Sequence, residues 1–118
     1  MTAFTKVVYA LLGTFAVVAG VVALVWPELA LPPDALPIAR HLVREEAALF
    51  IFVGLMFFWC LTHYEQRGVV HFALLAFIVV FAGVHWLDYV KGRAGIVGPL
   101  INTIPVALIA VTMPFGRR

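Results

Sequence analysis

Four long apolar runs, separated by short polar or proline-rich segments, dominate the pattern of hydrophobic and polar positions along this chain. They cover residues of about 5–26, 44–62, 69–90 and 96–113. An α-helix rises about 1.5 Å per residue, so about 20 apolar residues cross the ~30 Å hydrocarbon core of a bilayer. None of the runs alternates apolar and polar residues as barrel strands do. The pattern predicts an all-α fold, a four-transmembrane-helix antiparallel bundle that forms a single domain over residues 1–118.

The connection between the first two runs is the only long one, and it is rich in proline. Its prolines stand at positions 27, 32, 33 and 37, which excludes a regular helix in its first part. From Asp34 onward the spacing changes, because Asp34 can cap a helix and Ile38, Leu42 and Val43 share one face. We expect a short interfacial helix at about residues 34–43 that merges into the second transmembrane helix. The other connections are short, which favours antiparallel neighbours.

Glycines inside the runs predict where helices approach one another. Helix association in membranes relies on small residues that let backbones come close. Gly13 and Gly20 lie in the first run, Gly54 in the second and Gly83 in the third. We expect all four to be close-packing points.

The composition agrees with a membrane environment. The chain of 118 residues is 64% hydrophobic and 12% charged, whereas soluble domains are about half apolar and a quarter charged. So short a chain has too little interior to hide this much apolar surface from water, so we expect a lipid bilayer around it. The net charge of +2 is small and the basic residues are scattered, which argues against a nucleic-acid partner.

The charged residues give only a weak signal for orientation. Four crossings would put both termini on one side, and lysine and arginine are balanced across the two sides. The terminal side holds Lys6, Arg67, Arg117 and Arg118, and the other side holds Arg40, Arg44, Lys91 and Arg93. Acidic residues lie mainly on the non-terminal side, so we expect both termini in the cytoplasm.

Polar side chains gather at the helix ends of the non-terminal side. They are Glu45, Glu46, His85, Trp86, Asp88 and Asn102. In an up-down bundle these helix ends share one membrane face, and ionisable groups within a membrane usually pair or face the bundle interior. One interpretation is a pocket that binds a small ligand or relays protons. The other is that these groups pair with nearby arginine and lysine residues and fasten the helix ends.

The same residues do not predict a metal or a required cofactor. His85, Asp88 and Glu46 could supply three ligands, but no HExxH or paired ExxH spacing accompanies them. His71 and His85 lie nearly on one helix face, but the first and fourth runs offer no histidine to pair with His85 for haem. This leaves open a haem or chlorophyll shared with a partner subunit. The nucleophile and phosphate-binding motifs of common enzymes are absent.

The layout resembles the DoxX-like group of small four-helix membrane proteins, including its bacterial relatives. The features that carry the resemblance are Leu12-Gly13, Trp26-Pro27-Glu28, Glu45-Glu46, Phe52-Val53-Gly54-Leu55 and Glu65-Gln66-Arg67. Some members of this group resemble accessory subunits of quinone-linked or respiratory complexes. The resemblance implies a bacterial inner-membrane location and an accessory role.

Two function hypotheses follow. The first is a non-enzymatic accessory or scaffold subunit of a larger membrane complex, of the respiratory or photosynthetic electron-transfer type, in contact with other membrane-protein subunits or with further copies of itself. The second is a small four-helix protein that binds a ligand or relays protons through the polar pocket on the non-terminal side.

Overall fold

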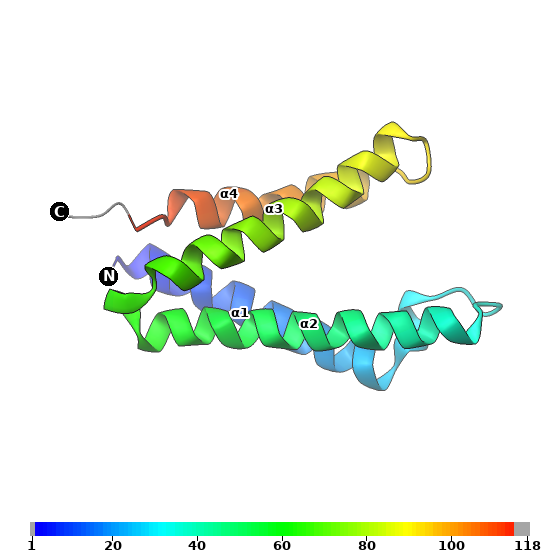
Figure 1. Cartoon of the computed structure of the whole chain (residues 1–118), viewed down its shortest axis with the longest axis horizontal. Helices are drawn as coiled ribbons and strands as arrows, with labels where there is room; N and C mark the ends of the chain where they lie inside the picture. The colour runs from blue at the N-terminus through cyan, green and yellow to red at the C-terminus, as the bar shows by residue number, and fades with distance from the viewer. Residues whose placement is uncertain (1, 115–118) are drawn as a thin grey trace. The chain divides into compact units, whose positions relative to one another are not determined.

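The computed structural model describes residues 2–114, in which all regular structure is helical (Figure 1). The α-helices are α1 (Ala3–Val25), α2 (Pro37–Thr62), α3 (Gly68–Val90) and α4 (Val97–Val111). Two 3₁₀ turns, η1 (Pro27–Ala30) and η2 (Tyr64–Gln66), lie in the connections. No strand occurs between residues 2 and 114, so the prediction of an all-α chain with four helices is confirmed. Arg117 and Arg118, which entered the charge count, lie outside the described residues.

Within the described residues, three helices are long and apolar enough to cross a membrane. They are α1 and α3, with 23 residues each, and α2, with 26. The fourth helix, with 15 residues, is shorter than the predicted run of 96–113. At 1.5 Å per residue it spans only about 22 Å. Pro114 limits α4 at its end, since a residue that precedes proline disfavours the helical conformation.

The short helix predicted at about residues 34–43 is continuous with the second long helix, as expected, and its place at a membrane interface stays a prediction. The helix α2 begins at Pro37 and continues without interruption to Thr62. Proline suits the first position of a helix, where its missing N–H is not needed. No proline or glycine occurs between Pro37 and Gly54 to break the helix that starts there. The proline-rich connection instead forms the single turn η1, in which Pro27 is buried.

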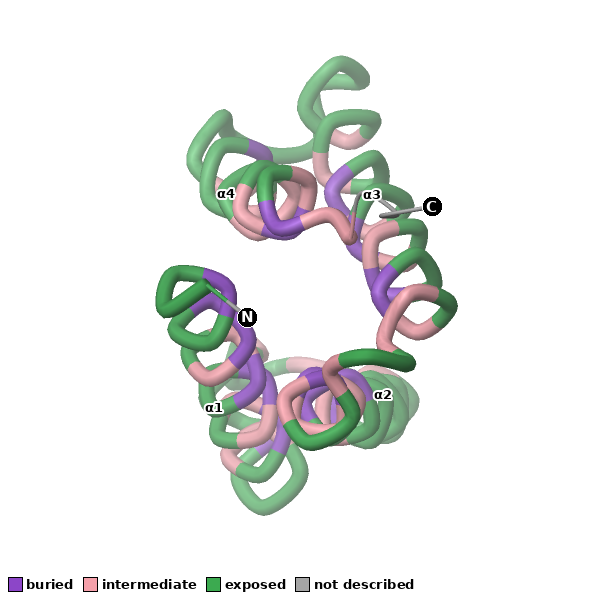
Figure 2. The backbone as a smooth tube through the Cα atoms, turned by 90° about the vertical axis from the view of Figure 1, so that its left-hand side faces the viewer, coloured by how far each residue is buried: buried purple, intermediate pink, exposed green. Residues whose placement is uncertain are grey.

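The chain divides into two compact units. The first unit is residues 9–62, and the second combines residues 1–8 with residues 63–118. Buried positions follow one side of each long helix, and exposed positions follow the other (Figure 2).

In the first unit, α1 and α2 pack through small residues. A Cβ atom added at Gly54 would lie 2.8 Å from the carbonyl oxygen of Gly13, and one added at Gly20 would lie 2.8 Å from that of Ala47. The rings of Tyr9 and Phe57 meet further along, with centroids 6.1 Å apart. These pairs show that the two helices run in opposite directions and that their backbones nearly touch. The predicted close packing at Gly13, Gly20 and Gly54 is confirmed.

The prediction for Gly83 is wrong. Among the described residues, a Cβ atom added at Gly83 would have no heavy atom within 4 Å. The second unit packs α3 through larger side chains instead, with buried positions at His71, Leu74, Ile78 and Ala82. Their spacing of three and four residues places them on one side of the helix. Gly83 follows directly after this row and is itself exposed.

The glycine contacts predict a contrast between two substitutions of the same kind. Gly54→Ala should destabilise the protein by about 1–3 kcal/mol, because the new Cβ meets backbone atoms of α1 that cannot rotate away. Gly83→Ala should be neutral or stabilise the protein by up to about 1 kcal/mol, since alanine favours helix more than glycine does. Thermal unfolding in detergent, followed by circular dichroism, measures both. Equal effects of the two substitutions would contradict this account of the packing.

Candidate functional site

The predicted site residues are divided between the two units. Glu45 and Glu46 lie in α2 of the first unit. His85, Trp86 and Asp88 lie in α3 and Asn102 lies in α4, all in the second unit. The two groups are therefore described separately, and the pocket that would join them stays a prediction.

In the second unit, Trp86 ties α3 to α4. Its indole Nε1 donates a hydrogen bond of 2.9 Å to the hydroxyl of Thr103, which in turn donates to the carbonyl oxygen of Pro99 at 2.8 Å. His85 lies nearby, with its ring edge-on to Phe81 at 5.1 Å between centroids. Sequence reasoning missed Thr103, because nothing in its spacing marks which threonine on α4 faces the tryptophan. This chain of hydrogen bonds has a structural role.

Asp88 and Asn102 both interact with residues close to them in the sequence. The amide of Asn102 donates to the carbonyl oxygen of Gly98 at 2.8 Å, within its own helix. The carboxylate of Asp88 lies 3.8 Å from the guanidinium of Arg93 in the following turn, and both side chains are exposed. Exposed pairs of this kind contribute little to stability. The arrangement of Asp88 agrees with the helix-end pairing that we considered as the alternative to a pocket.

The end of α4 is held by side-chain hydrogen bonds. The last four carbonyl groups of a helix have no partner within it. The hydroxyl of Thr112 lies 3.0 Å from the carbonyl oxygen of Ile109 and 3.2 Å from that of Leu108. The backbone of Ile109 is also hydrogen-bonded to His71, which is completely buried in α3. His71 therefore links the two helices where α4 ends.

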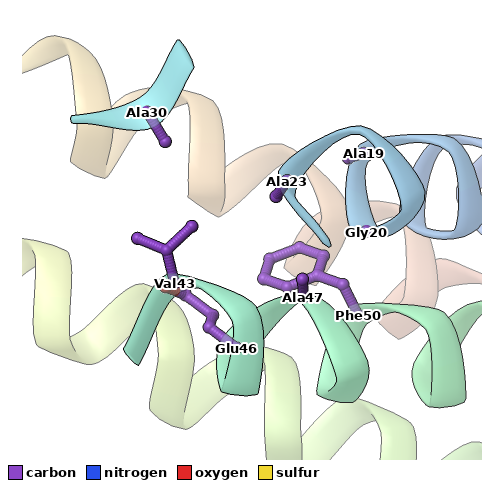
Figure 3. A pocket seen from close by; sticks show the side chains of 8 residues that line it. All are labelled: Ala19, Gly20, Ala23, Ala30, Val43, Glu46, Ala47 and Phe50. Carbon is purple, nitrogen blue, oxygen red and sulfur yellow. The ribbon is translucent and has the colours of Figure 1, made fainter. Parts of the chain in front are cut away.

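In the first unit, Glu45 and Glu46 have different surroundings. Glu45 lies one turn from His41, with 3.2 Å between carboxylate oxygen and imidazole nitrogen, and both side chains are exposed. Glu46 instead lines a cavity of about 280 Å³ between the end of α1, η1 and the start of α2 (Figure 3). The other lining residues are Ala19, Gly20, Ala23, Ala30, Val43, Ala47 and Phe50. We call this space the Glu46 cavity. Its walls are small or apolar, and Glu46 is the only ionisable residue among them.

The second unit contains a polar cavity that sequence reasoning did not identify. It is an open pocket of about 490 Å³ where α1 begins, η2 leads into α3 and α4 ends. Its polar lining residues are Thr2, Thr5, Tyr64, Arg67 and Thr112, and its apolar ones include Phe4, Val111 and Met113. We call this space the Arg67 cavity. Its residues come from three distant parts of the sequence, so only the folded arrangement brings them together.

Among residues 2–114, no group of three or more histidine, cysteine, aspartate or glutamate residues is placed to hold a metal ion. No family model matches the sequence, and neither the curated proteins nor the solved structures include a match. The resemblance to the DoxX-like group therefore stays a proposal.

The contacts of α3 with α4 predict a measurable coupling between Trp86 and Thr103. Trp86→Phe and Thr103→Val, separately and together, should give an interaction energy of about 1 kcal/mol, because each substitution removes the same hydrogen bond. The matched pair Asp88→Asn and Arg93→Gln should give less than about 0.5 kcal/mol, since that ion pair is long and exposed. Unfolding in detergent measures both cycles. A Trp86–Thr103 coupling no larger than that of the ion pair would show that the hydrogen bond does not fasten the helices.

Proposed function

We propose that this chain is an integral membrane protein in which all four helices form an antiparallel bundle. Three long apolar helices and the opposite directions of α1 and α2 support this arrangement. The shorter α4 suits a bilayer that thins locally, or a position partly covered by neighbouring helices. The balance of acidic residues supports termini in the cytoplasm, and the resemblance to the DoxX-like group supports a bacterial inner membrane.

Its function in this proposal is that of a non-enzymatic accessory subunit of a larger membrane complex. The observation that carries it is an exposed apolar stripe along α1. Leu11, Phe15, Val18, Val21 and Val25 follow one another at intervals of three and four residues, and all are exposed. They lie opposite the glycine face that packs on α2, so this side of α1 has no neighbour within its own unit. Spacing of this kind lets one helix interlock with a helix of another subunit.

A second candidate function is the binding of a small amphipathic cation in the Glu46 cavity. Small side chains leave room between α1 and α2, and the lining is apolar except for one carboxylate. Binding cavities typically combine an apolar lining with a few polar groups that orient the ligand. A ligand with an alkyl body and an ammonium group matches this lining, because its charge meets Glu46 while its body displaces water from the alanines.

The accessory role predicts that the stripe on α1 holds a partner. Purification in mild detergent should recover a second membrane protein, and Leu11→Ala together with Phe15→Ala should reduce its affinity by about tenfold or more. Phe72→Ala on α3 removes a similarly exposed ring and should leave the partner bound. Mass spectrometry identifies what co-purifies. A chain that purifies alone as a monodisperse monomer would contradict the proposal.

The cation-binding role predicts a preference that depends on Glu46. Octylammonium should bind more tightly than 1-octanol, which has the same alkyl length without the charge. Glu46→Gln should reduce this preference about two- to fivefold, the range of an exposed ion pair. Glu45→Gln makes the same change one residue away, outside the cavity lining, and should keep the preference. Ligand titration followed by NMR of the purified protein measures it. Equal behaviour of the two variants would rule out Glu46 as the binding group.

A further inference from the structure

We propose that the Arg67 cavity binds a phosphate group, and that an anionic phospholipid headgroup supplies it. This site lies in the second unit and needs neither of the two functions proposed above, but a lipid as its ligand rests on the proposed membrane-spanning bundle. Four features of the cavity support the proposal: the fixed position of the guanidinium, an unsatisfied donor, the hydroxyls of the lining and its apolar residues.

The guanidinium of Arg67 is held in place by Tyr64. Its central carbon lies 3.4 Å from the centroid of the Tyr64 ring, and its Nη1 donates a 2.8 Å hydrogen bond to the carbonyl oxygen of the same residue. A cation stacked on an aromatic face and anchored by a hydrogen bond loses little freedom when a ligand arrives. Arg67 is therefore oriented before anything binds.

Arg67 still has binding capacity to offer. Its Nε is buried and, among residues 2–114, has no hydrogen-bond acceptor. The ion pairs of this part of the chain involve other residues, so no carboxylate within it neutralises Arg67. A buried donor without an acceptor costs about 1–3 kcal/mol. Arg67 also lines the cavity, and its planar guanidinium fits phosphate oxygens with two parallel hydrogen bonds.

Two threonines that line the same cavity as Arg67 add hydroxyl groups. The hydroxyls of Thr2 and Thr5 are 2.7 Å apart, and either can donate to the other. One hydroxyl hydrogen of this pair therefore stays available to a ligand. Among the residues that the structure describes, no aspartate or glutamate lines the cavity. A cation and hydroxyls without a competing carboxylate favour an anion over a cation or a neutral molecule.

The surroundings favour a phospholipid as the source of the phosphate. The cavity lies where α1 and α3 begin and α4 ends, and in a membrane-spanning bundle these helix ends reach the headgroup level. Phe4 and Val111 line the same space and are largely exposed, which provides apolar surface for acyl chains. Basic pockets between transmembrane helices bind anionic headgroups in this way.

Lipid titration of the intact protein in neutral detergent, followed by native mass spectrometry, tests the proposal. Dioleoyl phosphatidylglycerol should bind the unmodified chain, and Arg67→Gln should weaken it about tenfold or more, because a charge-assisted hydrogen bond is lost. Lys6→Gln removes the same charge from a residue outside the cavity lining and should leave the affinity unchanged. Dioleoylglycerol, which has the same acyl chains without phosphate, should bind weakly and equally to all three proteins.

Two further arms keep the outcome interpretable. Thr5→Val preserves side-chain shape and should weaken phosphatidylglycerol a fewfold, which tests the site even if Arg67→Gln does not fold. Inorganic phosphate that displaces the lipid from the unmodified chain but not from Arg67→Gln would confirm phosphate recognition and make the free ion the ligand. The proposal is overturned if phosphatidylglycerol binds Arg67→Gln and Thr5→Val as tightly as the unmodified chain. It is also overturned if dioleoylglycerol binds the unmodified chain as tightly as phosphatidylglycerol does.

Discussion

The carbonyl groups of α4 must find hydrogen-bond donors, and this requirement shapes the second unit. A helix in a membrane cannot leave backbone groups unsatisfied without a large cost in free energy. Pro105 lies inside α4 and has no N–H to offer the carbonyl one turn earlier. At the C-terminal end of the helix, Thr112 and His71 both form hydrogen bonds with the backbone of Ile109. The buried His71 thus serves the end of the neighbouring helix.

The first unit meets a different constraint with a different set of residues. Its helices approach through glycine, so their backbones come together with no side chain between them. Large apolar side chains are then left for the outer side of α1, which is where Leu11 and Phe15 are exposed. Where the glycine contact ends, Ala19 and Ala23 continue the row of small residues, and together with Ala30 and Phe50 they line a space. The Glu46 cavity is therefore a consequence of the same small residues that bring the helices close.

Elements that depend on local sequence could be predicted well. Run length and apolar composition identified the four helices, and glycine inside an apolar helix identified three of the close contacts. The errors have local physical reasons as well. Pro114 ends the fourth helix early. Gly83 is exposed, although it follows directly after the buried residue Ala82. Which of the two positions is buried depends on the rotation of α3 about its axis.

The polar contacts could not be predicted, because they depend on the register between helices. Trp86 and Asn102 were recognised as polar groups near one membrane face, yet their partners are Thr103 and the Gly98 carbonyl. No pattern within one helix states which residue of another helix lies opposite. The Arg67 cavity shows the same limit more strongly, since Thr5, Arg67 and Thr112 are far apart in the chain.

Two arginines of the second unit illustrate how a charge that stabilises can be told from a charge that binds. Arg93 lies 3.8 Å from Asp88, with both side chains in the open, so its charge has a partner and its donors are solvated. Arg67 is stacked and anchored, and one of its donors is buried without an acceptor in the described part of the chain. Fixing the orientation of a cation costs conformational entropy. At Arg67 the contact with Tyr64 offsets this cost during folding, before any ligand binds. In the described part of the chain Arg67 has no anionic partner, and an anionic ligand can provide one.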